Sequence, residues 1–584
     1  MPLPLDLKGR PDERVLRQLV AALLFEGIVK ARTQPDIGET AFLWSLGGRQ
    51  FRCRGAITPF DRIRLVPGSV EIEDATGEWI EAPLAQLVSL LPGNGPNRGK
   101  LLGELTQTIA FSAWNDRNLP QRSRRAMSFA ELEGALDEGH PYHPCYKART
   151  GFSFADHAAF GPEAGNAFQL VWLLIARKHL RCALPTDEAV FWQAELGSET
   201  WSELQELQRR LGAAPEEFGF LPLHPWQWRT LSEPLLSGWI AAGEAHCLGP
   251  AGDHYTSTQS VRSLLNRDRP LAASIKLPLN MINTSSRRIL EPHSVCTAPV
   301  ISRWIAGMVA ADPAFERRYP LTILKEYAGV IADGDGPLAG QVAAIWRESA
   351  QATLEAGEAV IPFNALMMVE ADGRPFADDW IKRFGLMPWI NRLIEIAVLP
   401  VWHLLVHHGL AVEAHGQNML LVHRDGWPER LILRDFHESI EFSPGFLREP
   451  EEAPDFLSLH PLYRDAEPDQ YYWTDKLDSL RELVMDTLFV YNLSEISHLL
   501  EHCYDLSETL FWQRVESVLA AYASEHAAAE RLAQLGCDQP RILTESLMTR
   551  KLLALKPEYH HTVDNALAAG VLQRRRWHER DRVR

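Results

Sequence analysis

The chain has 584 residues, more than one ordinary hydrophobic core supports, so two or three domains packed together are expected. It is 46% hydrophobic and 23% charged, a globular composition that excludes a disordered or low-complexity protein. Its net charge of -17 argues against a sequence-independent grip on nucleic acid or on an anionic membrane.

The first residues predict a helix and no targeting signal. The opening "MPLPLDLKGRPDER" is polar and broken by proline, so we expect no signal peptide. Apolar residues then recur at helical spacing, at Val15, Leu16, Leu19, Val20, Leu23 and Leu24. The strand-like segments "FLWSL" and "RIRLV" follow. Seven scattered cysteines without a CxxC pair fit a reducing compartment. We therefore expect a cytoplasmic protein with a mixed first region.

Two histidine segments are flanked by prolines, "GHPYHPCYKARTGF" (139–152) and "LHPWQW" (223–228). His140 and His143 resemble metal ligands in type, but the prolines remove the helical geometry that HxxxH-type zinc sites use. We interpret these histidines as structural or substrate-orienting groups.

The segment "YTSTQSVRSL" places hydroxyl groups beside a guanidinium. In an extended chain, Ser260 and Arg262 project from one face, close to Ser257 and Thr258. Hydroxyls around an arginine suit a phosphate, although a surface strand is the simpler alternative.

The segment "AASIKLPLNMINTSSRRIL" predicts a strand followed by a helix. Apolar and polar residues alternate around Lys276, so that this lysine should point away from the core. "NTSSRRIL" is then interpreted as a polar cap that opens a helix, with Thr284 and Arg288 on one side of its first turn. Free backbone N–H groups and Arg288 would bind an anion there. The alternative is a capped surface helix with solvated arginines.

The last third is predicted to be mostly helical. Its most apolar stretch, "LIEIAVLPVWHLLVHHGLAV", contains Glu395, three histidines and Pro400, which favours a kinked buried helix over a membrane span. Long amphipathic segments continue to about residue 504 and beyond.

One hairpin interrupts these helices, in "AVEAHGQNMLLVHRDGWPERLILRDF" (411–436). Asp425-Gly426 is a strong reversal signal, so Asn418 and Asp435 should come back close together. With Glu413 they form a set of oxygen donors suited to Mg²⁺ carrying nucleotide phosphates. The pattern resembles kinase sites, and a kinase-like phosphotransferase is the strongest reading of these residues alone. A buried polar network, in a non-catalytic ligand-binding protein, is the alternative.

Taken in order, "GHPYHPCYKAR", "LHPWQW", "STQSVR", "IKLPLNMINTSSRR", "EAHGQN" and "LRDF" resemble the motifs of the NRPS-independent siderophore synthetases, the aerobactin-synthetase or IucA/IucC-like family. The resemblance implies an α+β cupped-hand fold with a thumb (1–165), fingers (166–385) and a mostly helical palm (386–584) that holds the kinase-like hairpin.

The resemblance also implies an ATP-dependent ligase. With ATP and Mg²⁺ it would adenylate a carboxylate of citrate or of a citrate derivative, and an amine or alcohol would then attack, releasing AMP and pyrophosphate. The family allows a homodimer and implies no nucleic-acid or membrane partner. The kinase-like phosphotransferase stays the alternative, but no glycine-rich strand-turn-strand precedes Lys276 as a kinase requires.

Matching motifs assign the site residues. ATP would contact Ser257, Thr258, Ser260, Arg262, Lys276, Gln417, Asn418 and Asp435. The carboxylate substrate would contact Thr284, Arg288, His415 and one of Lys551 and Lys556 in "MTRKLLALK". Magnesium would be held by Glu413, Asn418 and Asp435. The reaction itself would depend on Arg288, Thr284, His415 and Lys276.

His415 is predicted to be a positioning donor, because an attacking amine can lose its proton to solvent or to the leaving phosphate. Two departures from the family pattern, Ser285 after the threonine and His437-Glu438 after Asp435, leave the substrate open.

Overall fold

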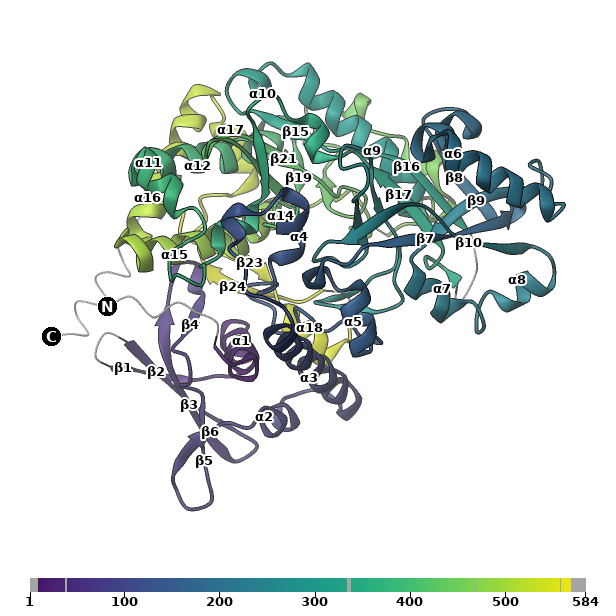
Figure 1. Ribbon diagram of the computed structural model, residues 1–584. Helices are drawn as coiled ribbons and strands as arrows, with labels where there is room; N and C mark the ends of the chain where they lie inside the picture. Colours follow the sequence, from purple (N-terminus) through teal and green to yellow (C-terminus); the bar gives the residue numbers. More distant parts are fainter. Residues whose placement is uncertain (1–8, 37–38, 333–337, 468, 557, 569–584) are drawn as a thin grey trace.

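The computed structural model describes residues 9–36, 39–332, 338–467, 469–556 and 558–568 (Figure 1). It is a mixed α+β structure, as predicted, with a small sheet near the N-terminus, a large central sheet and a mainly helical last third. The predicted domain limits at 165 and 385 stay a prediction.

The first region pairs helices with an antiparallel sheet. Its helices are α1 (Pro11–Phe25), α2 (Leu84–Leu90) and α3 (Gly95–Asn118). Its strands are β1 (Arg32–Asp36), β2 (Glu39–Leu46), β3 (Arg49–Ile57), β4 (Ile63–Leu65), β5 (Glu71–Glu73) and β6 (Trp79–Glu81). Strands β1-β2-β3-β5-β6 lie in this order, and β4 pairs with β3. The apolar stripe predicted for α1 is buried, as a helix packed on a core requires.

The central region is organised by an eight-stranded antiparallel sheet in the order β8-β16-β17-β12-β11-β10-β7-β9. Its strands are β7 (Phe168–Ala176), β8 (Leu180–Ala183), β9 (Phe218–Leu223), β10 (Ala245–Ser257), β11 (Ser263–Asn266), β12 (Ser274–Lys276), β16 (Glu326–Ala332) and β17 (Ala343–Arg347). Helices α6 (Glu188–Arg210) and α9 (Pro292–Ala311) pack against it (Figure 1). Strand β12 is short because Pro278 cannot donate to a ladder.

Smaller elements complete this region: α4 (Phe129–Ala135), α5 (Phe154–Phe160), α7 (Pro225–Leu231), α8 (Ser237–Ala241), β13 (Ile282–Asn283), β14 (Ser286–Arg287), α10 (Ala314–Arg317), β15 (Leu321–Ile323), β18 (Ala359–Pro362) and α11 (Asp378–Phe384). Short 3-10 turns lie at Pro59–Asp61, Arg124–Ala126, Pro162–Ala164, Arg177–His179, Ala350–Thr353, Phe363–Met367, Pro450–Glu452 and Pro461–Tyr463.

The last third is predominantly helical, as predicted. Its helices are α12 (Leu386–His403), the π-helical turn η8 (Leu404–His408), α13 (Phe456–Leu459), α14 (Leu477–Val484), the π-helical segment η11 (Met485–Leu493), α15 (Ser494–Tyr504), α16 (Glu508–Glu525), α17 (Ala529–Leu535) and α18 (Leu547–Leu553). Its strands are β19 (Leu410–Val412), β20 (Met419–Arg424), β21 (Trp427–Leu433), β22 (Ile440–Phe442), β23 (Arg541–Glu545) and β24 (His560–Asp564).

The predicted hairpin is confirmed as β20 and β21, which pair from Met419 opposite Leu433 to the turn at Asp425-Gly426. Both turn residues have positive φ, 52° and 94°, as a two-residue hairpin turn requires. The other end closes through Arg434 N–H, which donates to the Asn418 carbonyl oxygen at 3.1 Å. Strand β15 extends this sheet in parallel beside β21.

Two helices, α9 and the continuous stretch Leu386–His408, are long and apolar enough to cross a membrane by length and composition. In the second, 78% of the most apolar window is buried inside the protein, and Pro400 lies within α12. This stretch is the buried core helix that the sequence predicts.

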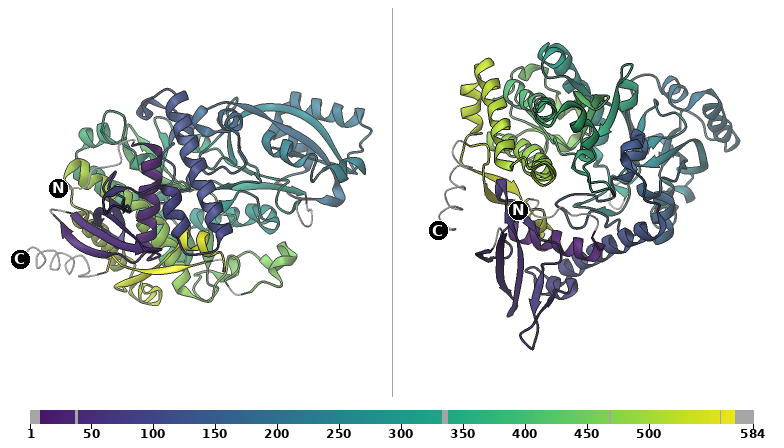
Figure 2. Two further views of the ribbon diagram at one scale, coloured as in Figure 1. Left: turned by 90° about the horizontal axis from the view of Figure 1, so that it is seen from below. Right: turned by 60° about the vertical axis from the view of Figure 1, so that its left-hand side comes forward.

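Both views in Figure 2 show the last helices (yellow) returning beside the first region (purple). The contact is made by Glu26, which follows α1 and is buried. Its carboxylate accepts hydrogen bonds from the N–H groups of Met548 (2.8 Å) and Thr549 (2.7 Å) at the start of α18, and from the Tyr142 hydroxyl (2.6 Å). The N-terminus of α18 is thus capped by a side chain more than 500 positions away.

Candidate active site

A buried cluster of opposite charges lies where the hairpin meets the large sheet. Asp435 Oδ1, just after β21, is 2.8 Å from Lys276 Nζ and 2.5 Å from Arg347 Nη1. Burial lowers the pKa of Lys276, whereas the two cations overcome burial and hold the pKa of Asp435 well below its usual value. As predicted, Lys276 points away from the apolar cluster that contains Ile275 and Leu277. The face it points to is buried as well, and the Asp435 carboxylate stabilises its ammonium there.

A second carboxylate, Glu326 at the start of β16, supports this cluster. It lies 3.9 Å from Lys276 Nζ and 2.9 Å from His437 Nδ1. It also accepts from the backbone N–H groups of Phe436 and His437, each at 3.2 Å, and thereby fixes the chain directly after Asp435. Lys276 and Asp435, predicted from separate motifs, therefore meet at Glu326 and Arg347, which neither motif includes.

The "STQSVR" motif forms the turn between β10 and β11, so the prediction of an extended chain there is wrong. The Thr258 hydroxyl lies 3.1 Å from the Ser260 hydroxyl and donates to the Ser263 carbonyl at 3.0 Å, which closes the turn. Ser257 Oγ is buried without a hydrogen-bond partner among the described residues. An unsatisfied buried hydroxyl of this kind is suited to a ligand oxygen.

The prediction of a helix opening at residue 284 is also wrong. The chain forms the two-residue strands β13 and β14, with Ile282 opposite Arg287, and the helix starts only at Pro292. Thr284 has a φ of 59° in the turn, which no helical first turn allows. Arg288 pairs through its backbone with Met281. The helix N-terminus is therefore absent from this motif, but the arginine remains.

The Arg288 guanidinium lies in an electrostatically unfavourable place. Burial, followed by the charge of Arg262, lowers the pKa of Arg288 to about 9, against the opposing charges of Glu413 and Asp435. Its Nε is buried without a partner in the described part of the chain. Since a guanidinium stays charged at neutral pH, a bound anion would relieve this cost.

His415 lies in the loop between β19 and β20. Its Nδ1 accepts from the N–H groups of Gln417 (3.1 Å) and Asn418 (3.2 Å), so the neutral ring carries its proton on Nε2. Nε2 lies 3.6 Å from Glu413 Oε1, and the Asn418 side-chain amide donates to the Glu413 carbonyl at 3.1 Å. The backbone thus leaves Nε2–H of His415 as the donor, and its positioning role stays a prediction.

His140 and His143 are held in the same way, by backbone N–H groups that donate to Nδ1. Burial and then His415 lower the pKa of His140 to about 3; burial and then Lys551 lower that of His143 well below its usual value. Lys551 Nζ pairs with the buried Glu104 of α3, whereas Lys556 is exposed over the Tyr559 ring. Of the two lysines, Lys551 is the one beside the histidines.

Backbone strain coincides with the motifs. Positive φ at a non-glycine residue is uncommon, and for a β-branched residue it is an outlier. Such values occur at Arg149 (35°), Val261 (60°), Thr284 (59°) and Asp435 (68°), each in a different motif. Strain of this kind concentrates at functional sites, where the surrounding structure maintains it.

An acidic wall is defined here as Glu441 of β22, Glu482 of α14 and Glu545 of β23; the charge of Glu413 acts on Glu441 and Glu545, and that of Glu558 on all three. Burial is the main cause that raises the pKa of each to about 7, and neighbouring carboxylates, among them Glu558, add to it. A cationic ligand would relieve this repulsion.

The acidic wall predicts a pH-dependent stability. Each of these carboxyl groups binds its proton more tightly in the folded protein than in the unfolded chain. The resulting stabilisation is fully present below the ordinary pKa of 4.5 and is lost as the pH rises through about 7. Glu441→Gln should therefore raise the free energy of unfolding by roughly 1–3 kcal/mol at pH 8 and by much less at pH 5. Urea denaturation at both pH values measures this, with the exposed Glu451→Gln as control. An equal gain at both pH values would contradict it.

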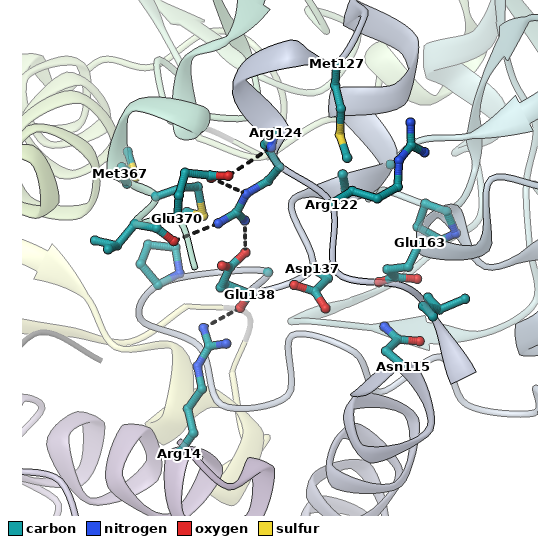
Figure 3. Close-up of a pocket in the computed structure, with 18 of the residues that line it drawn as sticks. Arg14, Asn115, Arg122, Arg124, Met127, Asp137, Glu138, Glu163, Met367 and Glu370 are labelled. Atoms are coloured by element: carbon teal, nitrogen blue, oxygen red, sulfur yellow. Dashed lines mark hydrogen bonds and ion pairs between the residues drawn. The ribbon is translucent and has the colours of Figure 1, made fainter. Parts of the chain in front are cut away.

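A cavity of about 1170 Å³ is lined by residues of the first region, such as Arg14 and Asn115, and by Ser257 and Glu370 from the central region (Figure 3). Its charged side chains largely satisfy one another: Arg124 pairs with Glu138 (2.6 Å) and Glu370 (2.7 Å), and Arg14 donates to the Glu138 carbonyl. Of the predicted site residues in the described ranges, Ser257 lines it. We therefore place the chemistry at the charged cluster.

In chemical type, the oxygen donors of Asp435, Glu413 and Asn418 suit Mg²⁺. A group whose ligand atoms lie within 4.8 Å of one another is Glu326, Asp435 and His437, so the magnesium set of Glu413, Asn418 and Asp435 stays a prediction. Arg288 Nε and Ser257 Oγ are buried without a hydrogen-bond partner among the described residues and are of the donor type that phosphate oxygens bind.

Sequence reasoning missed Arg347, Glu326 and His437 as site residues. Arg347 and Glu326 are charged residues at the ends of apolar strands, which is the signal that could have found them. His437 directly follows the "LRDF" motif.

Comparison with known proteins identifies the class. Residues 128–368 match the model of the IucA/IucC family, and residues 387–560 match that of the ferric iron reductase FhuF-like transporters. The chain belongs to the IucA/IucC family of siderophore synthetases.

Individual relatives cover nearly the whole chain. The citryl-spermidine/3,4-dihydroxybenzoyl-citryl-spermidine:spermidine ligase of Bacillus anthracis is 33% identical over 95% of this chain and 93% of its own length. Aerobactin synthase of Escherichia coli is 27% identical over 93% of both. The crystal structure of the petrobactin biosynthesis protein AsbB from Bacillus anthracis str. Sterne superposes with a TM-score of 0.90 at 31% identity, covering 97% of this chain and 96% of that one.

Proposed function

We propose that the protein is an ATP-dependent siderophore synthetase that adenylates a carboxylate of citrate or of a citrate derivative and joins it to an amine or alcohol. The observation that carries this is the buried Arg288 Nε, which has no hydrogen-bond partner among the described residues, in a guanidinium whose pKa is lowered by burial and by the charge of Arg262 against the charges of Glu413 and Asp435. Such a site favours an anionic substrate on one side and a cation-bound nucleotide on the other.

The nucleotide would lie along the turn of Ser257, Thr258 and Ser260. ATP is the ligand named for an aerobactin synthetase structure that shares this fold, IucA of Klebsiella pneumoniae. Asp435, Glu413 and Asn418 would hold Mg²⁺, which supplies neutralisation of phosphate charge. Lys276, whose ammonium is held by its ion pair with Asp435, would also contact the phosphates.

Two steps follow from these groups. A carboxylate oxygen attacks the α-phosphorus and pyrophosphate leaves; Arg262 and Arg288 stabilise the charge that builds there. The nitrogen or oxygen of the second substrate then attacks the acyl carbon, AMP leaves, and the proton passes to solvent or to the leaving phosphate. No protein nucleophile is needed, because positioning and charge supply the catalysis. His415 Nε2–H and the Thr284 hydroxyl would orient the carboxylate.

An amine is the nucleophile that the acidic wall favours. Its three carboxyl groups have raised pKa values, and Glu413 adds to the repulsion at two of them, Glu441 and Glu545. A polyamine carries a further, protonated amino group besides the one that attacks, and its positive charge would neutralise these carboxylates. Spermidine is named for the relative from Bacillus anthracis.

Incubation with ATP, Mg²⁺, citrate and hydroxylamine tests the proposal. We expect pyrophosphate and citryl hydroxamate, because hydroxylamine traps an acyl adenylate. A phosphotransferase built on the same hairpin would instead release ADP, and ADP as the sole product would reject the ligase. A panel of carboxylic acids against a panel of amines, scored by product mass, then identifies both substrates.

His415 provides a second prediction. His415→Gln keeps a side-chain N–H donor and should retain part of the adenylation rate, whereas His415→Ala should lose about 100-fold or more, as the loss of one preorganised donor does. The pH profile of the rate should not change shape in the glutamine variant if the ring is only a donor. A profile that loses one limb would show that His415 acts as a base.

The larger arrangement is part of the same proposal. We propose that residues 1–165, 166–385 and 386–584 act as thumb, fingers and palm around this site, and that the enzyme works in the cytoplasm, with a homodimer as the candidate assembly. Limited proteolysis with mass analysis would locate the two boundaries, and light scattering would give the assembly.

A further inference from the structure

Three histidines and an aspartate converge where α9 ends and α12 passes into the π-helical turn η8. Asp312 Oδ2 lies 2.9 Å from His403 Nε2, 2.9 Å from His408 Nε2 and 3.9 Å from His407 Nε2. All four ligand atoms lie within 4.8 Å of one another. None of these residues takes part in the site described above.

The π-helical turn explains why the three rings meet. In an α-helix, residues 407 and 408 could not both lie beside residue 403, because successive side chains diverge around the axis. The wider i→i+5 turn of Leu404–His408 places one on each side of it. π-helical turns are rare and are frequent at functional sites, so this distortion is itself informative.

The chemistry of the group suits a metal. Three imidazoles and one carboxylate are ligands that zinc-class ions prefer, and His403 and His408 are buried, so the group is largely shielded from solvent. Burial opposes ionisation of Asp312, but the N–H of Ala314 and the histidines hold its pKa below its usual value. In a tetrahedral zinc site with bonds of about 2.0–2.1 Å, neighbouring ligand atoms lie roughly 3.3 Å apart, close to the separations here.

The surroundings provide both support and access. The Tyr522 hydroxyl lies 2.8 Å from His403 Nδ1 and can accept a hydrogen bond from Nδ1–H when Nε2 binds a metal. His407 is 26% exposed and opens the group to solvent. Arg448 donates to His407 Nδ1 at 3.3 Å, and because this arginine is exposed it can turn away to free that nitrogen.

We propose that Asp312, His403, His407 and His408 bind one divalent transition-metal ion of the zinc class. Four protein ligands without an open position define a structural site. The ion fastens the end of α9 to η8, directly before Gly409 and β19, the strand that leads to Glu413. The bound ion would therefore stiffen the segment that leads to Glu413, although the ion itself lies outside the active site.

Metal titration of the untagged, chelator-treated protein tests this. With ZnCl₂ we expect one saturable equivalent by calorimetry and a melting temperature that rises with zinc concentration. With CoCl₂ we expect the visible absorption of tetrahedral Co²⁺. His407→Ala, the most exposed ligand, and Asp312→Asn should each weaken binding at least about tenfold. The matched control is His526→Gln, whose ring packs 5.1 Å from His403 but offers no ligand atom to the group.

The controls separate this site from others. His526→Gln should bind zinc like the wild type, and Glu413→Gln should keep the Co²⁺ spectrum. Absence of saturable binding would overturn the proposal. So would binding that His407→Ala and Asp312→Asn leave intact, since the ion would then lie in the nucleotide site or at cysteines. Circular dichroism of each variant confirms that the fold is present when binding is lost.

Discussion

Arg288→Ala should lower the rate of adenylation by about 100- to 1,000-fold, the loss expected when a preorganised group no longer stabilises developing charge. The variant should keep the fold and the thermal stability of the wild type. Burial and the charge of Arg262 already oppose the guanidinium, so that its removal relieves repulsion in the empty site. The melting temperature should therefore be equal to that of the wild type or higher, a trade-off between function and stability.

Two further variants sharpen this prediction. Arg288→Lys keeps the charge but loses the planar fork, and should recover only part of the activity. Arg287→Ala alters the neighbouring, exposed arginine, which bonds to Asn280, and should leave the rate unchanged. Pyrophosphate release and thermal denaturation measure the two effects. Equal losses in Arg287→Ala and Arg288→Ala would mean that the rate depends on the fold of the β13–β14 turn and not on the Arg288 guanidinium.

Asp435→Asn should have the largest effect on stability. The change keeps the shape of the side chain and tolerates the positive φ, but leaves Lys276 and Arg347 without their shared counter-charge. Breaking a buried ion pair at one partner costs about 3–5 kcal/mol. Adenylation should be lost as well, because the predicted magnesium ligand is removed. Urea denaturation at pH 7 measures the first effect, and Asp425→Asn at the exposed turn of the same hairpin is the control.

The pH dependence of this contribution has a definite sign. The depressed pKa of Asp435 means that its stabilisation is present throughout neutral pH and is lost as the pH falls below the ordinary value of 3.8. A double variant, Lys276→Met with Asp435→Asn, should recover part of the lost stability, since one unpaired cation is gone. Additive losses in the double variant would show that the pair is not coupled.

Sequence patterns predicted local structure well where one short-range rule decided it. The stripe of α1 and the Asp425-Gly426 reversal each depend on neighbouring residues, and both are confirmed. The burial of the helix around Pro400 followed from its composition in the same way.

The failures have one physical origin, which is tertiary contact. Alternation correctly placed Lys276 opposite Ile275 and Leu277, but it could not show that carboxylates from β16 and from beyond β21 bury the lysine on that second face. The polar run at Thr284 resembled a helix cap. Instead, the positive φ of Thr284 and the backbone hydrogen bond from Arg288 to Met281 form a hairpin. Arg347 could not be predicted as a site residue, because its role depends on Asp435, 88 positions later.

The cap that Glu26 places on α18 has a consequence for how the protein is made. The carboxylate is buried and its pKa is raised by burial; Tyr142 donates to it, and Met548 and Thr549 complete its hydrogen bonds. A ribosome delivers those last two donors 522 and 523 residues after Glu26. We therefore expect the end of α1 to complete its packing only late in synthesis and to be a site where the nascent chain depends on a chaperone.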